Sequence, residues 1–114
     1  MQSFYMNGYL WHCVLVRPNA DILIDRTGAR RIATTDARTR SIYISQSVDP
    51  GMRKRVILHE LAHVAMLSYG LIPEVEQFTI PSEQITAEEW VCNFIADYGH
   101  EIFEIAAALY ALWR

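Results

Sequence analysis

The chain has 114 residues, of which 52% are hydrophobic, 20% are charged and 11% are aromatic, and its formal net charge is −3. This length suits one compact unit, so we expect a single domain over residues 1–114. The apolar fraction excludes a disordered chain. The acidic balance argues against direct contact with nucleic acid, which favours a clustered basic patch.

The sequence shows no targeting or membrane-spanning segment. Its N-terminus lacks a basic stretch followed by an apolar run and a small-residue cleavage site. The most apolar stretch, residues 105–113, is far shorter than the roughly 20 residues that a membrane-spanning helix needs. Two cysteines, Cys13 and Cys92, cannot build a disulfide framework. We therefore expect a cytoplasmic protein with reduced thiols and no membrane association.

The first half of the chain is typical of strands. Segments rich in β-branched and aromatic residues are separated by turn signals, and they cover residues 9–16, 21–24, 31–35 and 41–45. Their short connections favour an antiparallel meander of three or four strands. We expect the segment from Ser41 to Ser45 to be an edge strand, at which Ile42, Tyr43 and Ile44 bind an extended peptide.

The second half is typical of helices. Asp49 and Pro50 predict a helix start, and Gly70 predicts its end near Tyr69. After an irregular stretch over residues 71–85, Thr86 predicts a capped helix that ends near Gly99. A last helix follows over residues 100–113, and we expect its apolar stripe to close the domain's own core. Docking of a partner, or self-association through this helix, is the alternative. Strands followed by helices predict an α+β fold.

The string His59-Glu60-Leu61-Ala62-His63 is the most informative part of the sequence. Residues four apart share one face of a helix, so both imidazoles can bind one ion. Glu60 projects about 100° away from His59, where a carboxylate can act as a base on water at the open position of a metal. An ordinary pair of half-buried histidines in a chance pattern is the alternative.

A catalytic zinc site usually has a third protein ligand, and the downstream helix offers two carboxylates for it. Glu89 shares a face with Asn93, so Glu89 can bind the ion while Asn93 accepts a ring N–H from His59 or His63. Glu88 is the reserve ligand. Alternatively, Glu89 caps its own helix, since it lies three residues after Thr86.

These residues resemble the ImmA/IrrE-type zinc metallopeptidases, a family of small gluzincin-like domains. The family pattern is a short strand, a helix with H-E-L-x-H and a later helix with E-x-x-A-N-x-F-A. Here the later helix reads Glu89-Trp90-Val91-Cys92-Asn93-Phe94-Ile95-Ala96, with Cys92 and Ile95 departing from the pattern. The stretch after Ala96 also departs from it.

The resemblance implies one Zn²⁺ per chain, with His59, His63 and Glu89 as ligands and Glu60 as the catalytic carboxylate. It implies a metalloendopeptidase acting on a protein substrate, such as a repressor in a phage, mobile-element or stress-response setting. A metal-binding regulatory module that cleaves nothing efficiently is the alternative function, and a metal-free structural domain is a third.

Overall fold

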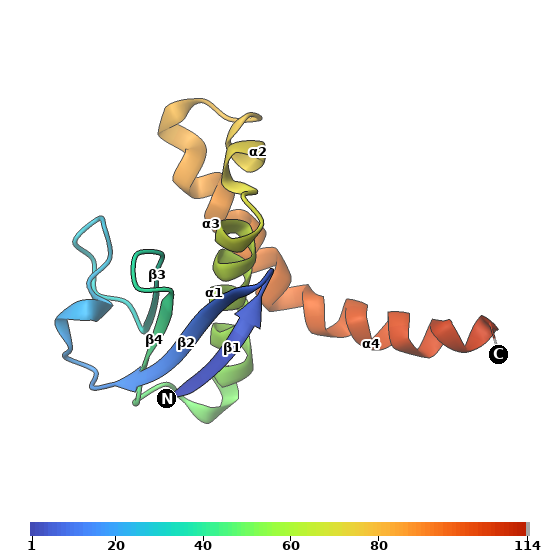
Figure 1. Ribbon diagram of the computed structural model, residues 1–114, viewed down its shortest axis with the longest axis horizontal. Helices are drawn as coiled ribbons and strands as arrows, with labels where there is room; N and C mark the ends of the chain where they lie inside the picture. The colour runs from blue at the N-terminus through green and yellow to red at the C-terminus, as the bar shows by residue number, and fades with distance from the viewer. Residues whose placement is uncertain (114) are drawn as a thin grey trace.

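The computed structural model describes residues 1–113, with a sheet formed by the first half of the chain and helices by the second (Figure 1). The predicted α+β fold is confirmed. The strands are β1 (Gln2–Met6), β2 (Tyr9–Val16), β3 (Ala33–Asp36) and β4 (Ser41–Ser45). The α-helices are α1 (Arg53–Ser68), α2 (Ile72–Glu76), α3 (Gln84–Phe94) and α4 (His100–Leu109). Short 3-10 turns occupy Asp21–Leu23, Pro50–Met52, Pro81–Glu83 and Tyr110–Trp113, and a π-helical turn, Ile95–Gly99, joins α3 to α4.

The order of the strands in the sheet is β1-β2-β4-β3, which corrects the predicted meander. The pairs β1–β2 and β3–β4 are antiparallel, but β2 and β4 are parallel, with Cys13 opposite Ile42. A parallel pair needs a long connection that returns the chain to the end at which it started. Residues 17–40 make that return and include β3, so β4 lies inside the sheet.

The first strand was not predicted, and the segment predicted as a strand over residues 21–24 is a 3-10 turn. Its backbone N–H groups bond three residues back, from Leu23 to Ala20 and from Ile24 to Asp21. The Leu23 side chain is fully buried. The apolar character of this segment therefore reflects one anchoring side chain under a loop and not a strand.

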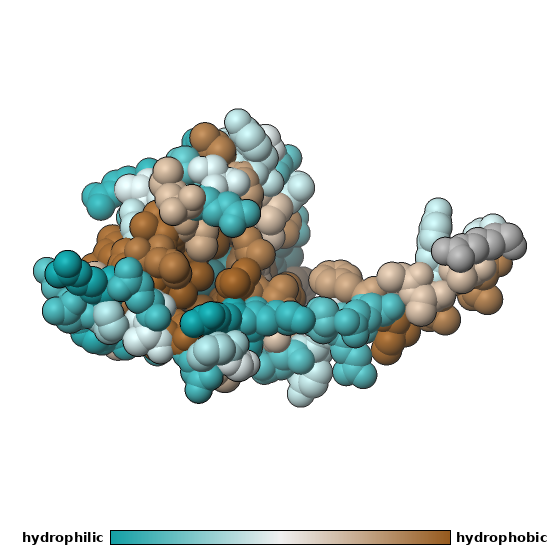
Figure 2. All heavy atoms as spheres, turned by 90° about the horizontal axis from the view of Figure 1, so that it is seen from below, coloured by the Kyte–Doolittle hydropathy of each residue, from teal (hydrophilic) through white to brown (hydrophobic). Residues whose placement is uncertain are grey.

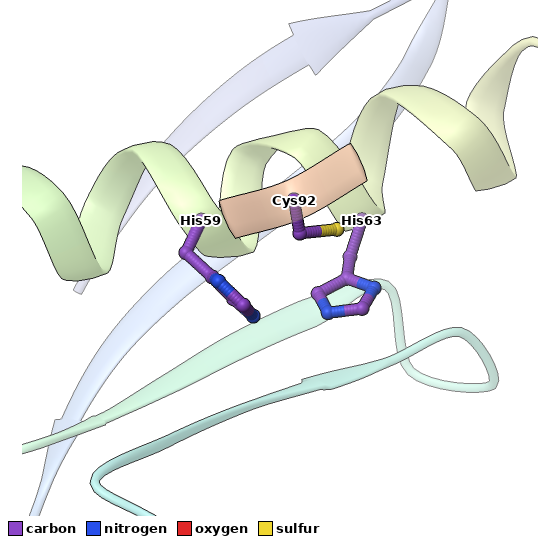
Figure 3. Close-up of side chains that lie close together, drawn as sticks. All are labelled: His59, His63 and Cys92. Carbon is purple, nitrogen blue, oxygen red and sulfur yellow. The ribbon is translucent and has the colours of Figure 1, made fainter. Parts of the chain in front are cut away.

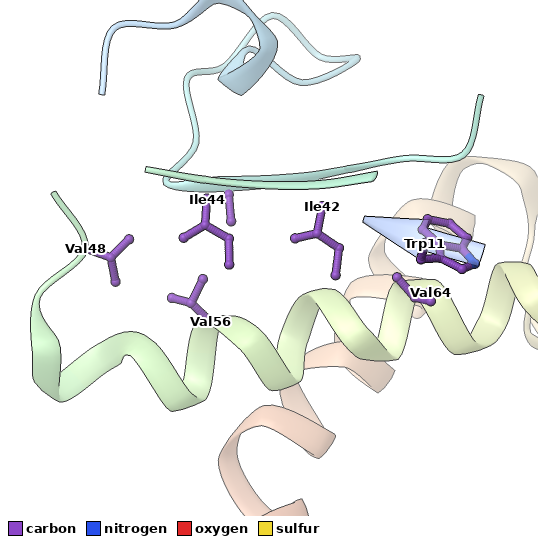
Figure 4. Close-up of a cluster of buried hydrophobic side chains, with 7 residues drawn as sticks. Trp11, Ile42, Ile44, Val48, Val56 and Val64 are labelled. Carbon is purple, nitrogen blue, oxygen red and sulfur yellow. The ribbon is translucent and has the colours of Figure 1, made fainter. Parts of the chain in front are cut away.

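The main hydrophobic core lies between the sheet and one face of α1. Figure 4 shows Ile42 and Ile44 of β4 facing Val56 and Val64 of α1, with Trp11 of β2 at one end of the cluster. A second cluster lies on another face of the same helix, where Ala62 and Met66 pack against Cys92 of α3, while α2 contributes partly buried side chains. Because α1 packs on both sides, it holds the sheet and the other helices in fixed positions.

The boundaries of the later helices differ from the prediction. The first helix begins with the 3-10 turn after Asp49, whose carboxylate accepts from the Gly51 N–H, and Gly70 with φ +65° follows its end, as predicted. The stretch predicted to be irregular contains the short helix α2, and a 3-10 turn from Pro81 continues into α3 from Gln84, so Thr86 lies inside α3 and caps nothing. Gly99 does not end a helix either, because the π-helical turn carries the chain directly into α4.

The expectation that the last helix closes the domain's own core is wrong. Figure 1 shows α4 leaving the body of the molecule, and every residue from Glu101 to Trp113 is exposed. Within residues 1–113, no helix combines the length and the hydropathy that crossing a membrane requires.

Candidate metal centre

Helix α1 presents His59 and His63 on the same side, one turn apart. Their ring centroids lie 5.1 Å apart, with the ring planes at 64°. Both side chains are about one-fifth exposed, so each ring keeps an open edge. Figure 3 shows both rings projecting from α1 on the side that faces the strands. This arrangement follows from the i, i+4 spacing alone.

Helix α3 brings the Glu89 carboxylate to both rings. Glu89 Oε2 lies 3.1 Å from His59 Nε2, and Glu89 Oε1 lies 3.2 Å from His63 Nε2. The hydrogen bonds from His59 and then His63 hold the pKa of Glu89 well below its ordinary value, against the opposing effect of burial. The same bond to Glu89 raises the pKa of His59, although burial of the ring opposes it.

These distances fit a divalent metal ion such as zinc. Zinc bonds to imidazole nitrogen and carboxylate oxygen are roughly 2.0–2.2 Å long, so two ligand atoms of a tetrahedral site lie about 3.3 Å apart. The two N···O distances, 3.1 and 3.2 Å, are close to that separation. Glu89 is also 43% exposed, which leaves solvent access to one side of the group. One imidazole nitrogen, His59 Nδ1, is buried and has no hydrogen-bond partner.

Cys92 lies close to the same histidines and defines a second candidate ligand set. One ligand atom from each of His59, His63 and Cys92 lies within 4.8 Å of the other two, and Figure 3 shows the three side chains together. The thiol is fully buried between α1 and α3. Burial raises its pKa to about 12, with a smaller contribution from nearby carboxylates, chiefly Glu89. The carboxylate oxygens of Glu89 lie 3.1 and 3.2 Å from the two Nε2 atoms, and this closer approach favours Glu89 over Cys92 as the third ligand.

Glu60 lies on α1 next to His59, and only 6% of its surface is exposed. Its Oε2 accepts a hydrogen bond from the Thr35 hydroxyl on β3. Thr35 therefore fixes the orientation of the carboxylate that the motif assigns to proton transfer. Sequence reasoning did not single out Thr35, since a strand with two adjacent threonines carries no motif.

Asn93 does not make the hydrogen bond that was expected of it. The amide contributes slightly to raising the pKa of His59. Its Oδ1, however, accepts from Arg55 Nη2 at 3.4 Å, and His59 Nδ1 is left without a partner. Arg55, one turn before His59, also donates to Asp97 at 2.7 Å. Arg55 therefore donates to the Asn93 oxygen that was expected to accept a ring N–H from a histidine.

Glu88, the alternative third ligand, lines the same cavity but pairs with an arginine and not with the histidines. It is 5% exposed, and its Oε2 lies 3.3 Å from Arg26 Nη2 in the loop between β2 and β3. Neighbouring positions on α3 point in different directions because each residue advances the helix by 100°. The structure therefore brings Glu89, and not Glu88, to the paired imidazoles.

The strand expected to bind substrate is not an edge strand. β4 is hydrogen-bonded on both sides, and Ile42 and Ile44 are buried in the main core, so they are not available to a peptide. Tyr43, between them, is only partly buried, but its backbone pairs with Val14 and Thr34. The free edge near the histidines belongs to β3. Period-2 alternation identifies a strand but not its neighbours, which is why the edge was misplaced.

A cavity of about 720 Å³ opens over the histidines and Glu60. Its walls are β3, the loop over residues 22–32, and the facing sides of α1 and α3. Glu89 and Asn93 also line it. The paired imidazoles and Glu60 therefore face this cavity and not the main core.

The fold and this group of side chains are compatible with a small zincin-like domain. The chain belongs to the family described as the IrrE N-terminal-like domain, Peptidase_M78, whose model matches residues 20–110. The match includes all the residues of the candidate metal centre. Searches of curated proteins and of solved structures found no match for this chain. The resemblance inferred from the two motifs is thus confirmed at the level of the family, which is a family of peptidases.

Proposed function

We propose that this chain is a zinc-dependent metallopeptidase that hydrolyses a peptide bond in a protein substrate. The observation that supports it is the position of Glu89, whose two carboxylate oxygens lie 3.1 and 3.2 Å from the Nε2 atoms of His59 and His63. We propose these three residues as ligands of one zinc ion per chain. A zinc ion so held supplies a Lewis acid for the scissile carbonyl and lowers the pKa of water toward about 7.

Glu60 is the residue that we propose for proton transfer. It follows His59 directly in the chain, and its carboxylate lines the cavity. The hydrogen bond from Thr35 occupies one lone pair of Oε2, and the remaining lone pairs can accept a proton from water and return it to the leaving amine.

The substrate that suits this cavity is an extended polypeptide. β3 lines the cavity and has a free edge, where a bound strand gains main-chain hydrogen bonds. This edge replaces β4 as the proposed binding strand. A regulatory protein, such as a repressor in a phage, mobile-element or stress-response setting, is the substrate that the family resemblance suggests.

The first experiment measures metal content. We expect about one zinc per purified chain, and His63→Ala should weaken zinc binding at least about 100-fold because one of three protein ligands is lost. His12→Ala is the matched control, since His12 lies on β2 and bonds to Ser3 at 2.8 Å. A His63→Ala chain with unchanged zinc content would contradict the ligand assignment.

The second experiment separates a peptidase from a metal-binding interaction module. The zinc-loaded chain is incubated with a proteome-derived peptide library, and cleavage is read by mass spectrometry. Glu60→Gln should keep the metal and lose cleavage by about 10²–10⁴-fold, while the exposed Glu83→Gln should cleave normally. If the zinc-loaded chain cleaves no peptide, or if Glu60→Gln is as active as the original, the interaction module is the better interpretation.

A further inference from the structure

Helix α4 and the 3-10 turn that follows it form an arm that, along most of its length, packs against no other part of residues 1–113. Figure 1 shows the arm extending away from the sheet and the other helices. The radius of gyration of the chain is 15.4 Å, whereas a compact domain of this length has about 13 Å. Isolated helices this short are marginal in water, so an arm of this kind needs a partner surface to be stable.

The arm has one strongly apolar face. At 100° per residue, its large apolar side chains fall within a half-turn, and Glu101 and Glu104 lie on the other side. Ala106 lies inside the apolar half and near the middle of the arm. Figure 2 shows apolar side chains along the outer part of the arm. The exposed members of this face are Ile102, Phe103, Ile105, Leu109, Tyr110, Leu112 and Trp113.

The exposed apolar area matches what a stable dimer buries. The seven side chains are between 47% and 79% exposed. Since a large side chain offers on the order of 150–250 Å², together they present roughly 900 Å². Each partner of a standard protein interface buries about 800 Å². A single protomer leaves this area in water, but a second copy of the same face would cover it.

The helix dipole of the arm favours an antiparallel pair, and its charges disfavour a membrane surface. Its acidic residues, Glu101 and Glu104, both lie in the half nearer the body. Both lie outside the apolar half and so stay on the outer side of either kind of pair, whereas the helix dipoles align favourably only in an antiparallel pair. Helices that lie on anionic membranes carry Lys and Arg on the polar face, and the described part of this arm carries none.

We propose that α4 is a dimerisation helix, which pairs antiparallel with α4 of a second copy of this chain. The two helices cross near Ala106, whose small side chain allows the backbones to approach closely. The apolar half of each arm then covers that of the other, and the body of each protomer lies at an opposite end of the pair. This inference does not depend on the proposed function, because none of its residues lines the cavity.

The test compares two lysine variants that differ by one position. Leu109→Lys places a charge on the apolar face, whereas Ala108→Lys places it on the opposite face, one turn after Glu104. Light scattering after gel filtration at micromolar concentration should give twice the mass of one chain for the original and for Ala108→Lys. Leu109→Lys should raise the dissociation constant of the dimer about 100-fold or more, because both copies lose a buried leucine. Far-UV circular dichroism checks that each variant is folded.

Other results would overturn the proposal. If the unmodified chain is monomeric, it has no such interface. If it is monomeric and also sediments with phosphatidylglycerol vesicles, the arm binds membranes instead. A Leu109→Lys chain that remains dimeric, with zinc content unchanged, has its interface elsewhere. None of these outcomes affects the measurements of zinc binding or peptide cleavage, so the two proposals can fail separately.

The orientation has its own test. In an antiparallel pair centred on Ala106, position 102 of one copy lies opposite position 110 of the other. Ile102→Cys mixed with a size-tagged Tyr110→Cys should therefore give a disulfide-linked heterodimer under mild oxidation. Ile102→Cys alone should crosslink no more than the unmodified chain does. Efficient crosslinking of Ile102→Cys alone would show a parallel pair and overturn the proposed arrangement.

Discussion

Thr35 on β3 donates its hydroxyl hydrogen to Oε2 of Glu60 on α1, and this bond joins the edge of the sheet to the motif helix. Glu60 is 6% exposed, so few water molecules can replace the hydroxyl. A bond to a buried carboxylate contributes more to stability than one between neutral groups. The same contact keeps the free edge of the sheet beside the paired imidazoles.

Replacing Thr35 tests that contact. Thr35→Val keeps the shape of the side chain but removes the donor, so we expect the free energy of unfolding to fall by about 1.5–3 kcal/mol in urea denaturation at neutral pH. Thr35→Ser keeps a hydroxyl and should recover most of the loss. Equal losses in the two variants would mean that the methyl group matters and the hydrogen bond does not.

Removing the Cys92 thiol decides between the two ligand sets. Cys92→Ala should leave the zinc dissociation constant within about threefold of the original, because Glu89 and not the buried thiol is the proposed ligand. The substitution should lower the free energy of unfolding by about 1–2 kcal/mol, because it leaves a small cavity between α1 and α3. Glu89→Ala is the comparison and should weaken zinc at least about 100-fold. If Cys92→Ala weakens zinc binding more than Glu89→Ala does, the metal ligands are His59, His63 and Cys92.

A buried hydrogen bond links the sheet to the end of α1. The Trp11 Nε1–H donates to Ser68 Oγ at 3.0 Å, and both residues are buried. Ser68→Ala leaves the indole N–H without its partner, so it should cost about 1–3 kcal/mol in urea denaturation. In a Trp11→Phe background the same change should cost much less. Equal costs in both backgrounds would show that the bond contributes nothing to stability.

The loop beside the cavity should be sensitive to acid. Hydrogen bonds from Thr27, and then the Arg31 side chain, hold the pKa of Asp25 well below its ordinary value of about 4. Because the pKa of this carboxyl is lower in the folded state than in the unfolded state, its ionised form stabilises the fold at pH values above the unfolded-state pKa. That contribution is lost as the pH falls below the unfolded-state pKa toward the folded-state pKa. The urea midpoint of the original chain should therefore fall more between about pH 5 and pH 3 than that of Asp25→Asn.

The control for the acid sensitivity is Asp21→Asn. Asp21 lies in the same loop, and its carboxylate makes no side-chain hydrogen bond within residues 1–113. This variant should follow the pH profile of the original chain. If Asp25→Asn also follows that profile, the Asp25 contacts do not stabilise the folded state.

The local parts of the site could be read from the sequence, and the non-local parts could not. The placement of His59 and His63 on one face depends only on helix geometry, and the second motif pointed to Glu89 before the packing of α3 on α1 was known. The contacts of Thr35, Arg55 and Glu88 depend on which elements become neighbours, and residue spacing does not encode that.

The same limit explains the errors in the fold. Alternating apolar residues identified the strand from Ser41 to Ser45, but the pattern is identical for an edge strand and for one inserted between β2 and β3. An apolar helix face is equally uninformative about its partner, since it reads the same when it covers the domain's own core and when it is left exposed, as α4 is.

The parallel pairing of β2 with β4 has a consequence for the order of folding. The hairpins β1–β2 and β3–β4 involve residues close in sequence, so each closes a short loop and can form within microseconds. Joining them requires the ends of residues 17–40 to meet, which costs more chain entropy and slows the reaction. We expect this closure to be the late step, so that Thr35 reaches Glu60 and the cavity wall takes shape only when the two hairpins have united.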